Sequence, residues 1–391
     1  MLAVVGGMHY YLWIRLVRDP ALAEPWRRIA TTAIVLGALS IPAGMFAWRL
    51  VGHPLPRLLP LAAYAWLGVA FLLFSSVLLL DLVRWIGVAA SWLASTFRGV
   101  PEPPASPERR LFLARAVAGG AVLVAGTAAA SGLRSAAGEP QVSEVPVKME
   151  RLPRALSGFT IAHVSDLHVG PTIGTREVER VVEETNALRP DLVVITGDLV
   201  DGTVAELREA VAALGRLKAR HGVAFVTGNH EYYTRDGVES WMAELRRLGV
   251  RVLRNERMTV GDRGPGGASF DLAGIDDWRS RGMAPGHGPD LVRALAGRDP
   301  DRSLVLLQHQ PLGFPEAVGR GVELQLSGHT HGGQIFPFSL LVGAVYRFPK
   351  GLFRHAEDGR QGHIYVSRGT GYWGPPMRVG NPPEIARIVL S

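Results

Sequence analysis

Residues Ser327–Gly333 read Ser-Gly-His-Thr-His-Gly-Gly and place two histidines, His329 and His331, directly after the apolar run Val322–Leu326. The run predicts a buried strand, and the glycines beside the histidines predict a tight turn at its exit. Histidines one residue apart in such a turn project to different sides, so they can reach two metal ions that lie side by side. A single His-x-His pair is weak evidence of a metal site, and its weight depends on the other strand exits.

Four further apolar runs end in polar residues of the same kinds. The runs are, in chain order, Phe159–Val164, Leu192–Thr196, Val223–Thr227 and Leu304–Leu307. The polar residues that follow them are Asp166 with His168, Asp198, Asn229 with His230 and Glu231, and His309. Because the carboxyl ends of strands form the ligand crevice of an open α/β sheet, we expect these side chains to gather at one edge of the fold.

The mixture of side chains limits the kind of site that they can form. Neutral imidazoles together with carboxylate and amide oxygens suit manganese, iron or zinc better than calcium. The 391 residues include no cysteine, which excludes a thiolate metal site and a disulfide framework. The alternative is a set of unrelated polar residues at strand ends, and it is the weaker one because each residue lies in its predicted strand context.

The apolar runs alternate with stretches that have helical periodicity. Helices are predicted over Thr175–Leu188, Val204–Arg220, Gly237–Leu248 and Pro289–Leu295. Alternating strands and helices predict an α/β sandwich.

The ligand-bearing motifs resemble those of the calcineurin-like metallophosphoesterases. That family has the pattern D-x-H, G-D, G-N-H, a lone H and G-H-x-H, and this chain has every element in order from Asp166 to His331. The resemblance covers residues 156–391 and implies an α/β sandwich of two sheets flanked by helices. The stretches Asn229–Tyr233 and Gly328–Gln334 look like the branch that contains membrane-associated bacterial phosphodiesterases.

The resemblance also implies a role for each candidate residue. Two divalent ions, of manganese, iron or zinc, would be bound side by side and bridged by Asp198. One ion would be held by Asp166, His168, Asp198 and His331, and the other by Asp198, Asn229, His309 and His329. His230 would stay unligated and act on the substrate, and Glu231 would orient it.

The activity implied by these roles is hydrolysis of a phosphoester by a metal-bridging hydroxide, with His230 protonating the leaving group. We expect a phosphodiesterase that acts on a lipid-linked or envelope phosphoester. A phosphomonoesterase or a protein phosphatase is an alternative among enzymes. A non-catalytic, metal-stabilised membrane sensor or binding module is a further alternative, and the unligated His230 counts against it.

The first third of the chain is apolar enough to contain membrane spans. Hydrophobic residues make up 47% of the chain, and its mean hydropathy of +0.15 is high for a wholly soluble protein. We expect about three transmembrane helices in residues 1–100 and a fourth span in residues 101–135. The four spans are Met1–Val17, Ile29–Trp48, Leu58–Leu80 and Ala116–Leu133, and Leu82–Phe97 is expected to be an interfacial continuation of the third.

The arginines predict how these spans are oriented. They are numerous in the first and third connections and sparse in the second, which holds Arg49 and Arg57. Because positive loops stay cytoplasmic, the amino terminus and the carboxyl-terminal domain are both expected outside the cytoplasm. The same rule explains the net charge of +7, so we expect a cell-membrane protein that has a membrane and a phosphoester as partners, and no nucleic acid.

The connection between the third span and the carboxyl-terminal domain contains several distinct segments. Pro101–Pro107 is a proline-rich linker, and Arg109-Arg110 with the cleavage candidate Ala128–Ala130 resembles a twin-arginine export signal. An ordinary positive flank of a membrane span is an equally good explanation of the arginine pair. Residues 136–155 are expected to be a polar tether to the domain at 156–391.

Two further features have alternative interpretations. Ile335–Phe353 is rich in apolar residues and contains Arg347 and Lys350. It is either a buried hairpin of the second sheet or an apolar, basic lip that contacts a membrane or accepts an acyl chain. His163 lies within the first predicted strand and is expected to be a core residue whose hydrogen bonds are satisfied.

Overall fold

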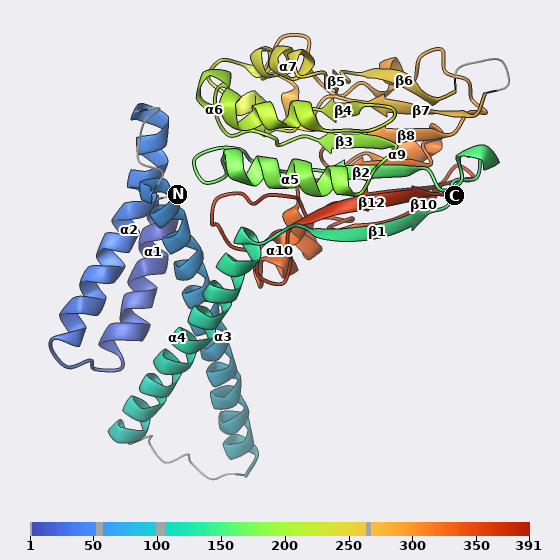
Figure 1. Ribbon diagram of the computed structural model, residues 1–391. Coiled ribbons are helices and arrows are strands. Elements are labelled where there is room, and N and C mark those ends of the chain that lie inside the picture. Colours follow the sequence, from blue (N-terminus) through green and yellow to red (C-terminus); the bar gives the residue numbers. More distant parts are fainter. Residues whose placement is uncertain (1, 52–57, 99–105, 263–266) are drawn as a thin grey trace. The chain divides into compact units, whose positions relative to one another are not determined.

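The computed structural model describes residues 2–51, 58–98, 106–262 and 267–391 and divides the chain into two compact units. One unit comprises Met1–Arg134 with Gly374–Met377, and the other comprises Ser135–Trp373 with Arg378–Ser391. Helices make up the first unit, and the second contains layered sheets with helices beside them (Figure 1).

Within its described residues, the helical unit contains one short helix and three long ones. The elements are α1 at Leu2–Trp13 with a π-helical turn at Ile14–Arg18, α2 at Trp26–Val51, α3 at Leu58–Arg98 and α4 at Pro107–Ala137. α3 and α4 are long and apolar enough to cross a membrane. The segment Leu82–Phe97 forms the second half of α3 and continues the third predicted span without a break. The spans over Met1–Val17 and Ile29–Trp48 stay predictions.

A buried group of polar residues joins the start of this unit to α3. Arg15 donates through Nε to Asp81 at 2.8 Å, and the Tyr11 hydroxyl donates to the same carboxylate at 2.5 Å. Charged side chains in an apolar helical region are costly unless they are paired. The pairing therefore fixes how the short first helix packs against α3.

The second unit is built on two six-stranded sheets. The first sheet has the order β1-β12-β2-β3-β4-β5, with β1 at Gln141–Val147, β12 at Glu384–Leu390, β2 at Thr160–Val164, β3 at Leu192–Thr196, β4 at Val223–Val226 and β5 at Arg251–Val252. The second has the order β10-β11-β9-β8-β7-β6, with β10 at Gly351–Glu357, β11 at Arg360–Val366, β9 at Leu324–Ser327, β8 at Leu304–Leu307, β7 at Ser269–Gly274 and β6 at Glu256–Gly261. The strands β2 to β5 run parallel, as do β7, β8 and β9, so their carboxyl ends share an edge in each sheet. The predicted two-sheet α/β fold is confirmed.

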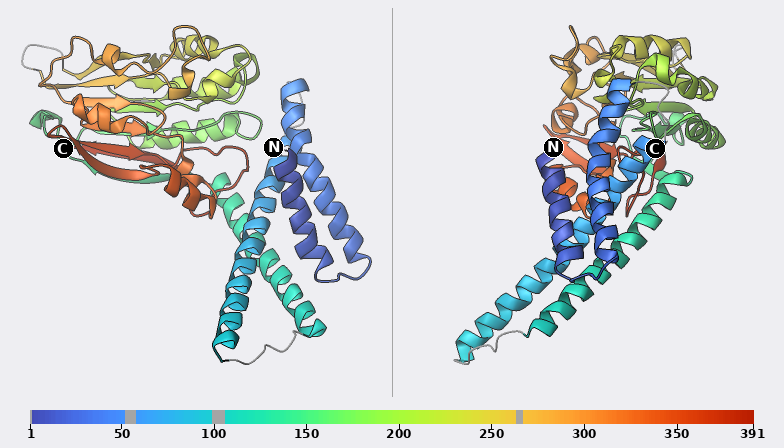
Figure 2. Two further views of the ribbon diagram at one scale, coloured as in Figure 1. Left: turned by 180° about the vertical axis from the view of Figure 1, so that it is seen from behind. Right: turned by 90° about the vertical axis from the view of Figure 1, so that its left-hand side faces the viewer.

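Helices cover the outer faces of the sheets (Figure 1, Figure 2). They are α5 at Thr175–Ala187, α6 at Val204–Val211, α7 at Val238–Arg247, α8 at Leu291–Leu295 and α9 at Phe314–Gly319. The predicted helix Val204–Arg220 is too long, because the α-helix ends at Val211 and a 3₁₀ turn follows over Ala212–Arg216. This turn contains Gly215, whose low helix propensity favours an early end.

The apolar core lies on both faces of the first sheet. Ile161 and Leu192 point between the sheets and pack with Phe270 of the second sheet. Neighbouring residues on the same strands point the other way and pack beneath α5, α6 and α7, where Trp241 is fully buried. Burial on both faces explains why these strands are continuous apolar runs without a polar face.

The tether predicted at residues 136–155 is wrong in part, because Gln141–Val147 is the strand β1. It pairs in parallel with β12, with Val145 opposite Ile388, and its residues Val145 and Val147 are buried. The two-sheet fold therefore begins before residue 156. A strand whose partner lies near the end of the chain cannot be recognised from local sequence, because only the distant pairing makes it part of a sheet.

The hairpin alternative for Ile335–Phe353 is also wrong. The helix α10 occupies Phe338–Val345, and β10 begins only at Gly351. An apolar run of this length is compatible with a helix or a strand, so its periodicity cannot decide between them.

Candidate metal centre

The predicted ligands converge on the shared edge where the parallel strands end. Each follows the last residue of β2, β3, β4, β8 or β9 by two to four positions. The residues brought together are Asp166, His168, Asp198, Asn229, His230, His309, His329 and His331. Their ligand atoms form two groups that share no residue, and a third group, of His168, Asp198 and His230, that overlaps both.

The first group consists of Asp166, His168 and His331, whose ligand atoms all lie within 4.8 Å of one another. The Nε2 atoms of His168 and His331 are 3.1 Å apart, and His331 Nε2 lies 3.5 Å from Asp166 Oδ1. Two ring nitrogens at this distance can share one N–H···N hydrogen bond or can both bind one cation, and the adjacent carboxylate of Asp166 favours the cation. This geometry fits a cation held by the three side chains.

The second group consists of Asp198, His309 and His329, again within 4.8 Å. His309 Nε2 lies 3.1 Å from Asp198 Oδ2 and 3.2 Å from His329 Nδ1. Asn229 Oδ1 is buried and has no hydrogen-bond partner among the described residues. A buried amide oxygen without a partner is costly, and a cation at this position would satisfy it.

Asp198 lies between the two groups. Its Oδ2 atom is 3.1 Å from His309 Nε2 and 3.9 Å from His168 Nε2, which belong to different groups. One carboxylate can therefore contact a cation in each group, as the bridging assignment requires.

The backbone of the centre is strained at five of the seven predicted ligands. The angle φ is 53° at Asp166, 51° at His168, 48° at Asp198, 72° at His329 and 50° at His331. Non-glycine residues in this left-handed region cost about 1–3 kcal/mol each and are retained mainly at functional sites. The positive φ angles direct these side chains toward the same region. Residues that only terminate a strand would not require this costly backbone conformation.

Two motif glycines allow the loops to approach one another closely. A Cβ atom at Gly228 would lie 2.2 Å from Asp198 Oδ1, and one at Gly328 would lie 2.1 Å from Asp166 Oδ2. Any side chain at either position would displace a predicted ligand. These glycines are therefore part of the centre, and they explain the Gly-Asn-His and Gly-His elements of the motif.

His230 is held by a residue that the sequence analysis missed, Asp201. His230 Nδ1 donates to Asp201 Oδ1 at 2.5 Å, and His168 Nδ1 lies 3.2 Å from Asp201 Oδ2. Burial lowers the pKa of His230, but the carboxylates of Asp198 and Asp201 outweigh it and raise the pKa to about 9. His230 Nε2 remains directed toward the centre, 3.9 Å from Asp198 Oδ2.

Among the described residues, the side-chain hydrogen bond of His230 goes to Asp201 and not to Glu231, whose carboxylate nevertheless helps to raise the pKa of His230, so its orienting role stays a prediction. Its buried carboxylate accepts from the backbone N–H groups of Gly228 at 2.6 Å, Leu199 at 2.7 Å, Asp198 at 3.1 Å and Val200 at 3.3 Å. Glu231 therefore fixes the loop that carries Asp198 to the loop that carries Asn229. A carboxylate that follows a histidine in sequence can turn to the backbone instead, because neighbouring side chains project in different directions.

A chain of hydrogen bonds extends from the centre into the first sheet. Ser165 Oγ donates to Asp166 Oδ2 at 2.6 Å, and Thr196 Oγ1 donates to Ser165 Oγ at 2.8 Å. His163 Nε2 donates to Thr196 Oγ1 at 2.8 Å, and burial lowers the pKa of His163 to about 4, which keeps the ring neutral. The backbone oxygen of Thr196 also accepts from His309 Nδ1 at 2.7 Å. Thr196 thus supports one ligand in each group.

His163 is only half satisfied, which differs from the expectation for a core histidine. Its Nδ1 atom has no partner in the part of the chain that the structure describes. The side chain is nevertheless fully buried within β2. Its bonded nitrogen, Nε2, is linked through Thr196 and Ser165 to Asp166. His163 therefore helps to position a predicted ligand.

Three aromatic side chains lie beside histidines of the centre. The ring centroids of Tyr233 and Trp373 lie 5.2 Å and 5.8 Å from that of His230. Tyr346 Oη lies 3.1 Å from His329 Nε2. Tyr233 and Trp373 are more than half exposed, so the approach to His230 passes apolar surface.

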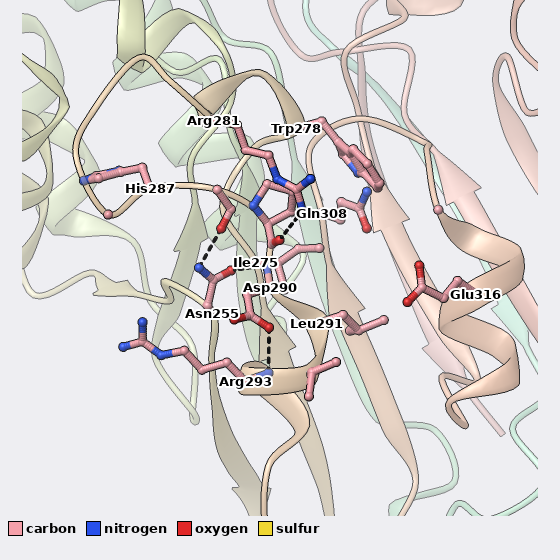
Figure 3. A pocket seen from close by; sticks show the side chains of 15 residues that line it. Asn255, Ile275, Trp278, Arg281, His287, Asp290, Leu291, Arg293, Gln308 and Glu316 are labelled. Atoms are coloured by element: carbon pink, nitrogen blue, oxygen red, sulfur yellow. Dashed lines mark hydrogen bonds between the residues drawn. The ribbon is translucent and has the colours of Figure 1, made fainter.

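A cavity of about 490 Å³ lies beside the second sheet and does not include the predicted ligands (Figure 3). Its walls include Asn255, whose Nδ2 donates to Gly288 O at 2.8 Å, and Asp290, whose Oδ1 accepts from the backbone N–H of Arg293 at 2.8 Å. These polar groups are already bonded within the protein. One of its lining residues, Gln308, is the neighbour of His309 in sequence.

Comparisons with known proteins agree with the geometry of the centre. A family model described as calcineurin-like phosphoesterase matches residues 159–333. A protein of Danio rerio named transmembrane protein with metallophosphoesterase domain is 36% identical over 100% of this chain and 87% of its own length. The protein of the same name in Bos taurus is 37% identical over 95% of this chain and 82% of its own length. A metallophosphoesterase of Helicobacter pylori is 37% identical over 64% of each chain. The similarity to the animal proteins thus includes the helical unit as well as the sheets.

Proposed function

Because the chain belongs to the calcineurin-like phosphoesterase family, we propose that it is a membrane-anchored, dinuclear metal-dependent phosphodiesterase. The observation that supports this most directly is the position of Asp198 between two groups of ligands, with His230 Nε2 facing the same carboxylate at 3.9 Å. A site that only bound metal would not need the additional histidine. The proposed reaction is hydrolysis of a phosphoester.

The two ligand groups would hold one divalent ion each, of manganese, iron or zinc. Asp166, His168 and His331 would bind the first, Asn229, His309 and His329 would bind the second, and Asp198 would contact both. When bound, such ions supply an activated water and neutralise the charge of the phosphate oxygens. The buried ligands, the strained backbone and the unpartnered Asn229 oxygen support this assignment.

His230 would donate a proton to the leaving oxygen. Its Nδ1 is fixed by Asp201, so the ring cannot rotate freely, and its Nε2 is the nitrogen that faces the substrate side. General-acid assistance of this kind is typically worth about 10²–10⁴-fold in rate. Asp201 positions the histidine, and Glu231 positions the backbone on which both ligand loops depend.

We propose a lipid-linked or envelope phosphodiester as the substrate. The support is the combination of α3 and α4, which could cross a membrane, with the exposed aromatic side chains next to His230. The arrangement of arginines favours a multi-pass protein whose catalytic unit faces away from the cytoplasm. A reporter that is active only outside the cytoplasm and is fused after Ser391 should be active, and activity of a cytoplasmic reporter alone would contradict this orientation.

The function can be tested with the full-length chain, Mn²⁺ and a panel of soluble phosphodiesters, phosphomonoesters and glycerophospholipids. We expect the diesters to be hydrolysed fastest. The variant His230→Ala should lose most activity toward esters with poor leaving groups and least toward nitrophenyl esters, whose leaving group needs no proton. Faster hydrolysis of monoesters, or an equal loss for all leaving groups, would contradict the phosphodiesterase assignment or the acid role of His230 respectively.

A further inference from the structure

α10 and the residues before it carry an exposed apolar surface. We define this α10 surface as Phe336, Phe338, Leu340, Leu341 and Val345, whose side chains are between 47% and 69% exposed. The helix Phe338–Val345 contains one polar residue, Ser339. Large apolar side chains that are exposed to solvent together usually mark an interaction site.

The α10 surface is connected to the metal centre at both ends. The turn that carries His331 ends at Gln334, and the surface begins two residues later. After α10, Tyr346 Oη lies 3.1 Å from His329 Nε2. Gln334 also exchanges hydrogen bonds of 2.9 Å and 3.0 Å with the backbone of Trp373, the exposed side chain beside His230. A molecule or a membrane that contacts the α10 surface would therefore lie next to the metal centre.

The connection between α4 and the unit that carries this surface is short. α4 is a candidate membrane span that ends at Ala137, and β1 of the catalytic unit begins at Gln141. Four residue steps extend to at most about 14 Å, since an extended chain spans about 3.3–3.6 Å per residue. The catalytic unit is thus tied closely to the end of a helix that could lie in a bilayer.

The charge beside the α10 surface favours anionic lipid headgroups. Arg347 follows α10 by two residues and is exposed, with its guanidinium 5.2 Å from the ring of Phe348. An apolar helical face flanked by a basic residue is the pattern of an element that lies in the membrane interface. The nearby candidate membrane span favours a lipid bilayer over a protein as the partner of this surface.

We propose that the α10 surface docks on the lipid bilayer, with its apolar side chains at the boundary between headgroups and acyl chains. The metal centre would then face phosphoesters at the membrane surface, so the substrate would be an amphiphilic lipid phosphodiester. The docking itself stands on the exposure of α10 and the short connection to α4, whereas this substrate class rests on the proposed function.

Docking can be measured directly because the chain has no cysteine. Leu341→Cys and, as a matched control, Val292→Cys of α8 are labelled with an environment-sensitive fluorophore in the full-length chain, in lipid nanodiscs that contain anionic and brominated lipids. The two side chains are similarly exposed, at 56% and 60%. We expect blue-shifted emission and quenching by brominated lipid at position 341, and neither at 292. Water-like emission at 341 would overturn the proposal, as would a blue shift without quenching, which would show that protein covers the surface.

The consequence for the substrate is tested with Leu340→Asp combined with Leu341→Asp, and with Val292→Asp as control. Because two large apolar side chains leave the interface, we expect at least about a tenfold loss of lipid diester hydrolysis in nanodiscs. Hydrolysis of a small soluble diester should stay near the wild-type rate, and the control should keep both activities. Loss of both activities would show that α10 belongs to the catalytic fold, and loss of neither would show that it does not select lipid. A wild-type chain that hydrolyses neither ester would contradict the proposed function, while the quenching result would still decide the docking.

Discussion

The four backbone contacts of Glu231 predict a large effect for the isosteric change Glu231→Gln. The glutamate carboxylate accepts from Asp198 and Gly228 with one oxygen and from Leu199 and Val200 with the other. A glutamine of the same shape has one acceptor oxygen and one amide nitrogen. Whichever way the amide is oriented, its nitrogen faces two N–H donors, so two of the four hydrogen bonds are lost.

The magnitude follows from the number and kind of these bonds. Hydrogen bonds to a charged group contribute about 1.5–3 kcal/mol each, so the loss of two predicts a destabilisation of about 3–6 kcal/mol. For a domain of this size, about 2–4 °C of unfolding temperature is lost per kcal/mol, which predicts a decrease of the order of 10 °C. A change at an exposed glutamate of α5, Glu183→Gln, should stay within about 0.5 kcal/mol of the wild type.

The assay is thermal unfolding of the purified full-length chain at saturating Mn²⁺, followed by intrinsic tryptophan fluorescence, with the leaving-group dependence of turnover measured in parallel. We expect a lower unfolding temperature for Glu231→Gln and an unchanged dependence on the leaving group. An unchanged unfolding temperature, together with a loss of activity concentrated on poor leaving groups, would refute the structural role and restore Glu231 as a partner of His230.

Two further predictions concern residues that support the ligands. Thr196→Val removes the hydroxyl that links His163 to Ser165 and should weaken metal binding by about 10–100-fold, as measured by titration of the metal-free chain; an unchanged affinity would show that the hydrogen-bond chain does not position Asp166. Asp201→Asn should lower kcat by about 10²-fold at saturating metal while KM changes little, because the orientation of His230 is lost; a change confined to KM would contradict this role.

The strand exits could be located from sequence because each is an apolar run followed by a motif with a fixed spacing. This is why six of the seven predicted ligands lie in groups whose ligand atoms are within 4.8 Å of one another, although they come from four separate loops. Asp201 was missed even though it lies three residues after Asp198 in the same loop. Its spacing from Asp198 is a usable signal, but its importance depends on the turn that directs it toward His168 and His230.

Other features depend on contacts that sequence patterns do not contain. β1 is part of the fold only because it pairs with β12, which follows it by more than two hundred residues. Arg378, which is 1% exposed, donates to the backbone oxygen atoms of His331 and Arg368 at 3.1 Å and 2.6 Å, and nothing in its local sequence distinguishes it from a surface arginine. α10 could not be separated from a core strand, because its exposure is a property of the folded chain.

The metal content of the wild type and of Asp198→Asn tests the central claim most directly. A bridging carboxylate supplies charge to both ions, so its loss should affect both at once, whereas His230→Ala should leave both in place. Elemental analysis of the purified chains should find two metal ions per chain in the wild type and in His230→Ala, and nearly none in Asp198→Asn. Two ions retained in Asp198→Asn, or a single ion in the wild type, would contradict a dinuclear centre bridged by this residue.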